Sequence, residues 1–338
     1  MRAWSVEQQG PVLSSTPLVL GDRDDPTPGP RDIIVAVDVC GVCRTDLHVV
    51  EGDLLLHRPS IVPGHEIVGR VVARGGDANR FAVGDRVGIA WLRSTCGSCR
   101  SCRRGQENLC RTPRFTGWDD DGGYAEYAAV DEAYAYALPD AIDDEQAAPL
   151  LCAGIIGYRA LSLVDLPPGG VLGIYGFGAS AHLAMQVALH RGATCHVFTR
   201  AAAARELALR LGAASADASD AAPPEPLDGA LLFAPAGELI PIALRALAPG
   251  GVLAVAGIHL TDIPAMSYAE HLFEERVLRS VTANTRADGE EFLRIAAGMT
   301  LQVTTQPYEF EQADRALVDL AADRVEGAAV IRVASPTT

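Results

Sequence analysis

Between residues 171 and 282, short apolar runs alternate with longer stretches of helical character, and no other feature restricts the fold of this chain so strongly. The first run, VLGIY, is followed by a turn and a predicted helix, and the pattern then repeats. Strands that alternate with helices of this length predict parallel β-α-β winding. The predicted strands span residues 171–175, 194–199, 229–233, 251–256 and 277–282, and the predicted helices span residues 178–191, 201–211 and 238–247.

The sequence on either side of this block has a different character. Valine- and isoleucine-rich runs bounded by turn residues predict strands in the front part, which is mostly strand and loop to about residue 140. A helix is predicted from about residue 146 to 163, although Pro149 and Gly154 interrupt its pattern. The flanking predictions are strands at 31–41, 66–73, 82–90, 301–310 and 328–333, and helices at 288–297 and 311–324.

A chain of 338 residues is long enough for two domains, because a single hydrophobic core rarely grows beyond about 250–300 residues. We expect an α/β protein in three parts. Residues 1–142 form a β-rich domain, residues 143–283 a doubly wound parallel-sheet domain, and residues 284–338 return to the first domain.

The net charge of -15 argues against nucleic-acid and membrane partners, because an acidic surface repels phosphate backbones and anionic lipids. No stretch approaches the roughly 20 apolar residues of a membrane span, and the N-terminus does not have the pattern of a signal peptide, so we expect a cytoplasmic protein. The sequence contains no lysine, which excludes a lysine Schiff base, a P-loop lysine and the Tyr-Lys chemistry of short-chain dehydrogenases.

Four of the eight cysteines fall in the segment CGSCRSCRRGQENLC. Thiolates spaced in this way can surround one ion, and four cysteine ligands complete a closed, structural zinc site. Disulfides are disfavoured in a cytoplasmic chain. The bacterial ferredoxin pattern places its fourth cysteine three residues after the third and follows it with proline, which does not occur here. The proposed structural zinc ligands are Cys96, Cys99, Cys102 and Cys110.

A second metal site is dispersed along the chain. Cys43 lies in CGVCRTDLH, His65 lies in PGHE and Cys152 lies in LLCAG. Two cysteines and a histidine form a ligand set that catalytic zinc uses while its fourth position stays open. Each residue alone is weak evidence, because a lone buried cysteine is usually a small hydrophobic residue.

The segment GFGASA follows an apolar strand and opens a helix, as a dinucleotide-binding turn does. Gly176, Gly178 and Ala181 occupy the positions that let a pyrophosphate approach the helix N-terminus. The next strand ends in Thr199-Arg200, where NAD-binding chains usually carry an acidic residue for the ribose. An arginine suits a 2′-phosphate, so we predict that NADP(H) is favoured over NAD(H); the alternative is that Arg200 only caps the following helix or points to solvent.

Together these segments resemble the zinc-containing medium-chain alcohol dehydrogenases over essentially the whole chain. The resemblance rests on GVCRTDLHVVEGDL, IVPGHEIVGRVV, VGDRV, the four-cysteine segment, DGGYAEY and GFGASA. It implies a GroES-like, β-rich catalytic domain and a Rossmann domain. It also implies one catalytic and one structural zinc, two Zn2+ per chain, and a homodimer or homotetramer.

The resemblance also implies roles for single residues. Glu66 is similar to the acidic residue that approaches the metal during ligand exchange, and Asp46 to the carboxylate that orients the liganded histidine. Thr45 corresponds to the hydroxyl at the alcohol oxygen, and His48 to the last protein member of a proton relay, with a surface histidine as the alternative. Trp91 corresponds to a bulky residue of the substrate pocket, with an ordinary core tryptophan as the alternative.

Three further positions bear on the cofactor site. Arg286, in ANTRAD, lies where related sequences carry a similar motif near the cofactor. Many relatives have a Gly-Arg pair before the final strand, whereas this chain has Gly327-Ala328, so another arginine substitutes or the cofactor binds more loosely. His259 is an alternative candidate for the edge of the substrate or cofactor cleft.

The expected reaction is hydride transfer between the nicotinamide cofactor and an alcohol or carbonyl compound, with a zinc-bound alkoxide and a proton path through Thr45 and His48. Two alternatives stay open: a biosynthetic carbonyl or enone reductase of the same fold, and an inactive zinc-stabilised binding protein. The physiological substrate is not specified by the sequence.

Overall fold

The computed structural model describes residues 1–257 and 260–333, and the chain forms two compact units. Unit 1 comprises Met1–Cys152, Ala283–Ala297 and the C-terminal segment from Gln302. Unit 2 comprises Ala153–Thr282 and Gly298–Leu301. In this division the segment of the parallel-sheet unit interrupts that of the β-rich unit.

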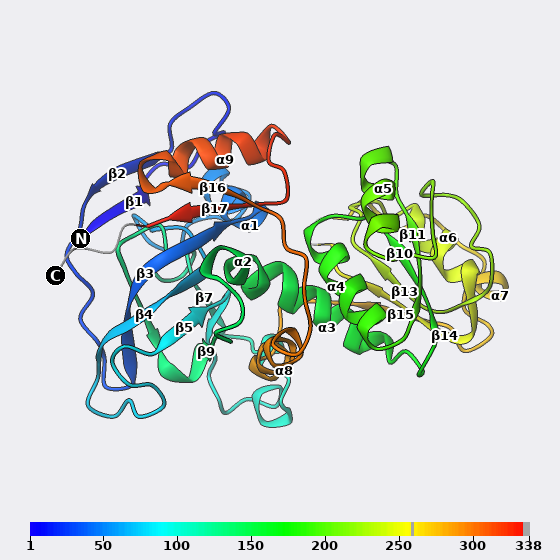
Figure 1. Ribbon diagram of the computed structural model, residues 1–338, viewed down its shortest axis with the longest axis horizontal. Coiled ribbons are helices and arrows are strands. Elements are labelled where there is room, and N and C mark those ends of the chain that lie inside the picture. The colour runs from blue at the N-terminus through cyan, green and yellow to red at the C-terminus, as the bar shows by residue number, and fades with distance from the viewer. Residues whose placement is uncertain (258–259, 334–338) are drawn as a thin grey trace. The chain divides into compact units, whose positions relative to one another are not determined.

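Unit 2 contains a six-stranded, fully parallel sheet with the strand order β12-β11-β10-β13-β14-β15. In Figure 1 the strands of this sheet lie between helices α4 and α6. The prediction of a doubly wound domain is confirmed, whereas the short strand β12 and the short helix α7 were not expected. The strands are β10 (Val171–Tyr175), β11 (Thr194–Phe198), β12 (Ser215–Asp217), β13 (Leu227–Leu232), β14 (Leu247–Val255) and β15 (Val277–Ser280), and the helices are α3 (Ile155–Val164), α4 (Ala179–His190), α5 (Ala202–Arg210), α6 (Leu239–Ala246) and α7 (Tyr268–His271).

Unit 1 is built on a seven-stranded sheet in which β16-β17-β3-β4-β5-β9 are neighbours and β8 pairs with β3. All pairs are antiparallel except β16 with β17, so the end of the chain adds its strands to a sheet that the front part began. The elements are β1 (Arg2–Val6), β2 (Leu18–Asp22), β3 (Asp32–Val42), α1 (Arg44–Glu51), β4 (Glu66–Arg74), β5 (Arg86–Ile89), β6 (Leu92–Ser94), β7 (Arg114–Phe115), β8 (Tyr127–Asp131), β9 (Ala135–Ala137), α2 (Asp144–Pro149), α8 (Arg286–Ala296), β16 (Thr305–Glu309), α9 (Ala313–Ala321) and β17 (Ala328–Arg332).

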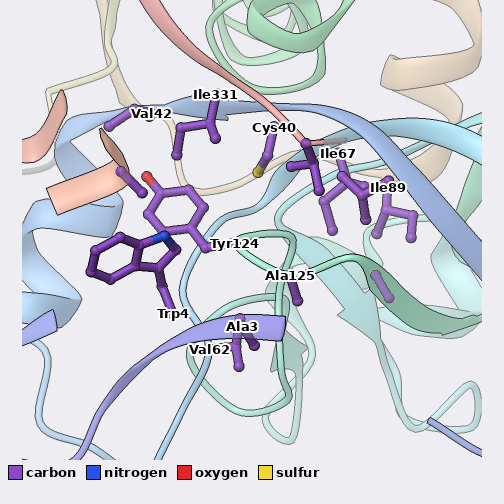
Figure 2. Close-up of a cluster of buried hydrophobic side chains, with 14 of the residues drawn as sticks. Ala3, Trp4, Cys40, Val42, Val62, Ile67, Ile89, Tyr124, Ala125 and Ile331 are labelled. Atoms are coloured by element: carbon purple, nitrogen blue, oxygen red, sulfur yellow. The ribbon is translucent and has the colours of Figure 1, made fainter. Parts of the chain in front are cut away.

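The core of unit 1 gathers buried side chains from distant parts of the sequence, as Figure 2 shows. Trp4, Cys40, Ile67, Tyr124 and Ile331 are all members of this cluster. The indole Nε1 of Trp4 donates to the carbonyl oxygen of residue 310 at 2.8 Å, so its polar atom is satisfied inside the core. These buried side chains therefore pack both ends of the chain against the sheet whose strands β3 and β4 flank the candidate metal ligands.

The predicted helix at 146–163 is divided into three parts. Helix α2 is followed by one turn of π-helix over Leu150–Gly154 and then by α3. Helix α2 packs on β3, β4 and β17, and the first segment of unit 1 runs to Cys152. By length and composition Asp144–Val164 would suit a membrane span, but 72% of its most apolar window is buried, as in the core helix of a globular protein.

Candidate metal centres and nucleotide site

Cys43 lies where strand β3 ends and helix α1 begins. It is the N-cap of α1 in an extended conformation, and its Sγ accepts from the backbone N–H of Thr45 at 3.3 Å. The Asp46 carboxylate in turn accepts from the backbone N–H of Cys43 at 2.9 Å. This reciprocal pair is a capping box with a thiol in the place of the usual hydroxyl. The helix therefore begins at a residue that presents its sulfur to the site.

His65 is completely buried, and its ring orientation is fixed by Asp46. The Asp46 Oδ1 lies 2.7 Å from His65 Nδ1 and also accepts from the backbone N–H of Gly64 at 3.2 Å. A carboxylate on Nδ1 leaves Nε2 as the nitrogen that can bind a metal. Asp46 thus connects the Cys43 backbone and the His65 ring.

Cys152 lies in the π-helical turn, where one extra residue widens the helix, a feature often found at functional sites. Its Sγ is 4.0 Å from Cys43 Sγ, and Cys43 Sγ is 3.5 Å from His65 Nε2. Zinc–sulfur bonds of about 2.3 Å and zinc–nitrogen bonds of about 2.0 Å imply separations of roughly 3.8 and 3.5 Å in a tetrahedron. Two thiols and an imidazole at these distances fit zinc.

Glu66 completes this cluster, since one of its carboxylate oxygens lies within 4.8 Å of the ligand atoms of Cys43, His65 and Cys152. The carboxyl group is buried, and burial raises its pKa well above the ordinary value. Gly41 makes room for it, because a Cβ at that position would lie 1.9 Å from Glu66 Oε2. The Glu66 side chain therefore lies beside the metal ligands, in a space that a residue larger than glycine at position 41 would fill.

The thiol of Cys43 is prepared for deprotonation. Its pKa lies well below the ordinary value, first because the Cys152 thiol donates a hydrogen bond to it, and further because His65 contributes positive charge. Metal ligation requires the thiolate form. The chemistry of this donor set agrees with its geometry.

The two expected relay residues lie on α1. Thr45 is buried, whereas the side chain of His48 is 20% exposed. Residues three apart lie on the same face of a helix, so both follow one side of α1. The Nδ1 of His48 is 2.7 Å from Asp53 Oδ2, a partner that the sequence analysis missed. The only sequence signal for it is Gly52-Asp53 directly after the helix.

Trp91 contacts the imidazole of a metal ligand. Its ring centroid is 5.1 Å from that of His65 in an edge-to-face arrangement, and 4.8 Å from that of Phe115 in a stacked one. Trp118 stacks on the same indole at 6.0 Å, and His57 lies over Trp118 at 4.5 Å. We call Trp91, Phe115 and Trp118 the aromatic cluster; only Trp91 was predicted from the sequence.

The four cysteines of the CGSCRSCRRGQENLC segment converge, and all four sulfur atoms lie within 4.8 Å of one another. Neighbouring sulfur atoms are separated by 3.4, 3.6 and 3.9 Å, close to the edge of a zinc tetrahedron. Backbone N–H groups also donate to Cys96 Sγ, which lowers the pKa of this thiol to about 6. The segment folds as a closed four-sulfur site without an open position, and it fits a structural zinc.

Arg286 is engaged at this lobe. Its Nε and its backbone N–H are 3.2 and 3.1 Å from Glu107 Oε1, and its guanidinium lies 4.7 Å from the ring centroid of Tyr134. Glu107 belongs to the short 3₁₀ turn that precedes Cys110. The geometry thus links α8 to the lobe through Arg286.

The nucleotide turn in unit 2 joins β10 to α4. Gly176 has a φ of +84°, which favours glycine, and Gly178 is the N-cap of α4 without any side-chain cap. A Cβ at Gly178 would meet no atom within 4 Å, so the turn is open on that side, while Ala181 is fully buried. Uncapped N–H groups at the start of a twelve-residue helix suit a pyrophosphate.

The end of β11 carries the residues predicted to distinguish the two cofactors. Thr199 is buried and donates its backbone N–H to the carbonyl of Asp217 at 2.9 Å. Arg205 Nη1 donates to the carbonyls of Thr199 and Arg200, both at 2.8 Å. Arg200 is exposed, and within the described part of the chain its guanidinium makes no ion pair. Arg205, which the sequence analysis overlooked, fixes the backbone of this turn.

Four further positions that the sequence analysis discussed either belong to neither group of candidate metal ligands or lie outside the described residues. Cys40 and Cys195 are buried free thiols, and Ala328 is the first residue of β17 and brings no charge to that position. His259 lies outside the described residues.

Comparison with known proteins agrees with this geometry. Residues 29–140 match the alcohol dehydrogenase GroES-like domain. The chain is 57% identical to a probable alcohol dehydrogenase of Mycobacterium tuberculosis, with 98% of this chain and 97% of that protein covered. Among solved structures, a cinnamyl alcohol dehydrogenase of Sorghum bicolor is 27% identical with a TM-score of 0.87, covering 100% of this chain and 99% of that one. A Helicobacter pylori enzyme crystallised with NADP(H) is 25% identical with a TM-score of 0.84, covering 98% of this chain and 99% of that one. The chain belongs to the zinc-containing medium-chain alcohol dehydrogenase family.

Proposed function

We propose that this alcohol dehydrogenase holds two zinc ions per chain and interconverts an alcohol and an aldehyde or ketone with NADP(H) as the preferred cofactor. The observation that carries the proposal is the difference between the two metal sites. Cys43, His65 and Cys152 provide two thiols and an imidazole with the Glu66 carboxyl beside them, whereas the cysteine lobe provides four thiols. A three-ligand zinc site keeps a position for the substrate, and a four-ligand site does not.

The residues around the open site have complementary tasks. A zinc ion held there supplies a Lewis acid that lowers the pKa of an alcohol and polarises a carbonyl in the reverse direction. Thr45 presents its hydroxyl to the alcohol oxygen, and His48 receives the proton and passes it to water from its partly exposed ring. Asp46 holds the His65 ring, and Glu66 is the acidic side chain available during ligand exchange.

The preference for NADP(H) rests on Arg200. The guanidinium is exposed next to the nucleotide turn, no carboxylate follows Thr199 directly, and Arg205 holds the local backbone. A planar guanidinium offers several donors to a 2′-phosphate. The complex of the Helicobacter pylori relative with NADP(H) supports the same direction.

A substrate panel with both cofactors tests the proposal. We expect primary alcohols, aldehydes and ketones to react, with a higher kcat/KM for NADP(H) than for NAD(H). Arg200→Ala should weaken NADP(H) binding by about 10- to 100-fold, because a hydrogen bond to a charged group contributes about 1.5–3 kcal/mol. NAD(H) binding should hardly change, and Arg210→Ala in the last turn of α5 is the matched control. Equal or better use of NAD(H) by the native chain contradicts the preference, and reduction of enones alone favours the alternative reductase.

Two further parts of the proposal concern the setting of the enzyme. We place it in the cytoplasm, and the eight free cysteines support a reducing compartment. We also propose a homodimer or homotetramer, because β15 is an edge strand with mostly exposed residues. Light scattering of the purified protein tests the oligomer, and a monomer at micromolar concentration would exclude it.

A further inference from the structure

The cysteine lobe, residues 96–110, contacts a helix from the far end of the chain. Helix α8 begins at Arg286, shortly after the unit 2 segment Ala153–Thr282 ends. Glu107 Oε1 accepts from the backbone N–H of Arg286 at 3.1 Å and from its Nε at 3.2 Å. Hydrogen bonds between a guanidinium and a carboxylate are stronger than those between neutral groups. The start of α8 is therefore fixed to the turn that precedes Cys110.

The contact with Glu107 leads directly to one of the metal ligands. Glu107 begins the 3₁₀ turn Glu107–Leu109, and its carbonyl accepts from the backbone N–H of Cys110 at 2.9 Å. The Glu107 side chain is 8% exposed, so its charge depends on a partner, because a buried charge without one is costly. Loss of the Arg286 guanidinium should therefore disturb the turn that sets the position of Cys110.

A second series of contacts joins Arg286 to Cys102. The guanidinium lies over the ring of Tyr134, 4.7 Å from the centroid. The Tyr134 hydroxyl accepts from the Thr95 backbone N–H at 3.0 Å and lies 2.9 Å from Thr95 Oγ1. Thr95 Oγ1 is in turn 3.5 Å from Cys102 Sγ. A cysteine that binds a metal is a thiolate, so the threonine hydroxyl donates to it, and such partners of metal ligands support metal affinity.

We propose that Arg286 is a positioning residue for the structural zinc, which slows release of the metal from the four cysteines by holding Glu107 and Tyr134. The two series of contacts meet at Arg286 and end at two different ligands, Cys110 and Cys102. Coupling between binding events is reciprocal, so the bound metal must hold the start of α8 to the same extent. The inference rests on the structural zinc of the proposed function.

A contribution of Arg286 to overall stability alone predicts a different result. Such a contribution would lower the stability of the native protein and of a metal-free lobe by the same amount. The positioning role predicts instead that the effect of Arg286 disappears once the lobe has lost its metal. The quantity to measure is therefore the coupling between the metal and the Arg286 side chain.

The first experiment follows zinc release to a coloured chelator from the full-length, zinc-loaded protein. Cys152→Ala identifies which phase of the release belongs to the cysteine lobe. Arg286→Gln should accelerate this phase about 10-fold, the lower end of the 10- to 100-fold in affinity that partners of metal ligands contribute. Arg286→Lys should restore only part of the retention, because an ammonium lacks the planar fork of donors. Glu290→Gln, which removes an ion pair with Arg80 from the same helix, is the matched control and should release zinc at the native rate.

The second experiment measures amide hydrogen exchange in α8. Cys110→Ala, which empties the lobe, should raise exchange in the first turn of α8 by a factor similar to the acceleration of zinc release. Exchange in α9 should stay at the native rate. Addition of Arg286→Gln to Cys110→Ala should cause no further increase, because the coupling is already lost.

The outcomes separate the two levels of the inference. If Cys152→Ala retains no zinc, the structural zinc of the proposed function is wrong and the role of Arg286 fails with it. If Cys152→Ala retains one zinc but Arg286→Gln does not accelerate the lobe phase, only the role of Arg286 is overturned. A weaker affinity of Arg286→Gln for NADP(H) at a native rate of zinc release would also overturn it and assign the residue to the cofactor.

Discussion

The Asp46 carboxylate lies 2.7 Å from Nδ1 of His65, and the two side chains are 2% and 0% exposed. The same carboxylate accepts from the backbone N–H of Cys43 at 2.9 Å, so one buried group orients two of the three candidate zinc ligands. Residues of this kind affect metal affinity without touching the metal.

Asp46→Asn should therefore weaken zinc binding at the open site by about 10- to 100-fold, the usual cost of losing a partner of a liganding histidine. Competition with a coloured chelator measures the affinity of the open site separately from the cysteine lobe. Asp25→Asn, which removes the same charge at the surface, should leave it unchanged. Native affinity in Asp46→Asn would show that the carboxylate does not support the site.

Removal of a cysteine from each metal site should separate activity from stability. Cys152→Ala should retain one zinc per chain, lose nearly all activity and unfold close to the native temperature. Cys110→Ala should also retain one zinc, at the open site. Without its metal the cysteine lobe loses the ion that holds its thiols together, so the melting temperature should fall more in this variant than in Cys152→Ala. Metal analysis, activity and thermal unfolding of both variants provide the comparison, and full activity of Cys152→Ala with only one zinc per chain contradicts the mechanism.

The elements that could be predicted from the sequence are those that neighbouring residues specify. Apolar runs separated by helices predicted β10, β11, β13, β14 and β15, and the cysteine and histidine motifs predicted which residues meet at both metal sites. Helix α1 was missed because its N-cap is a cysteine, which is not among the usual capping residues. The π-helical turn at Cys152 depends on the packing of α2 against the sheet, which no local pattern encodes.

Long-range partners of charged groups were equally inaccessible from the sequence. The contact of the Arg286 guanidinium with Glu107, 179 positions earlier in the chain, was not predicted. The partner of His48 was missed even though it is only five residues away, because it is the left-handed Gly52 that turns the chain back. Such pairs follow from the fold and cannot be read from residue type.

The pair of Glu107 and Arg286 predicts a pH-dependent contribution to stability. Burial alone raises the pKa of the Glu107 carboxyl, but hydrogen bonds from the backbone N–H groups of Glu107 and Arg286 and from the Arg286 guanidinium hold it below 4.5. A lowered pKa means that the contribution is fully present above about pH 4.5 and is lost as the pH falls through the folded-state value.

Glu107→Gln should accordingly lower the free energy of unfolding by about 1 kcal/mol at neutral pH, a modest value because Arg286 is partly exposed. Below about pH 4.5 the native protein and the variant should converge. Urea unfolding at pH 7 and at pH 4 measures both differences, and Glu290→Gln, which loses a surface pair with Arg80, is the control. If the difference in the free energy of unfolding between Glu107→Gln and the native protein is larger at pH 4 than at pH 7, the pKa of Glu107 is not lowered in the folded state.

Trp91 offers a test of the substrate pocket, because its indole packs edge-on against the His65 ring and also contacts the rings of Phe115 and Trp118. If this ring forms a wall of the pocket, Trp91→Ala should lower kcat/KM for aromatic alcohols about 2- to 10-fold, in keeping with about 0.5–1.5 kcal/mol for an aromatic pair. Small aliphatic alcohols should lose less, and Trp91→Phe should retain most of the discrimination. Trp118→Ala, one ring further from His65, should have a smaller effect on the same ratio. Equal losses for aromatic and aliphatic alcohols, together with a lower melting temperature, would instead assign Trp91 to the core.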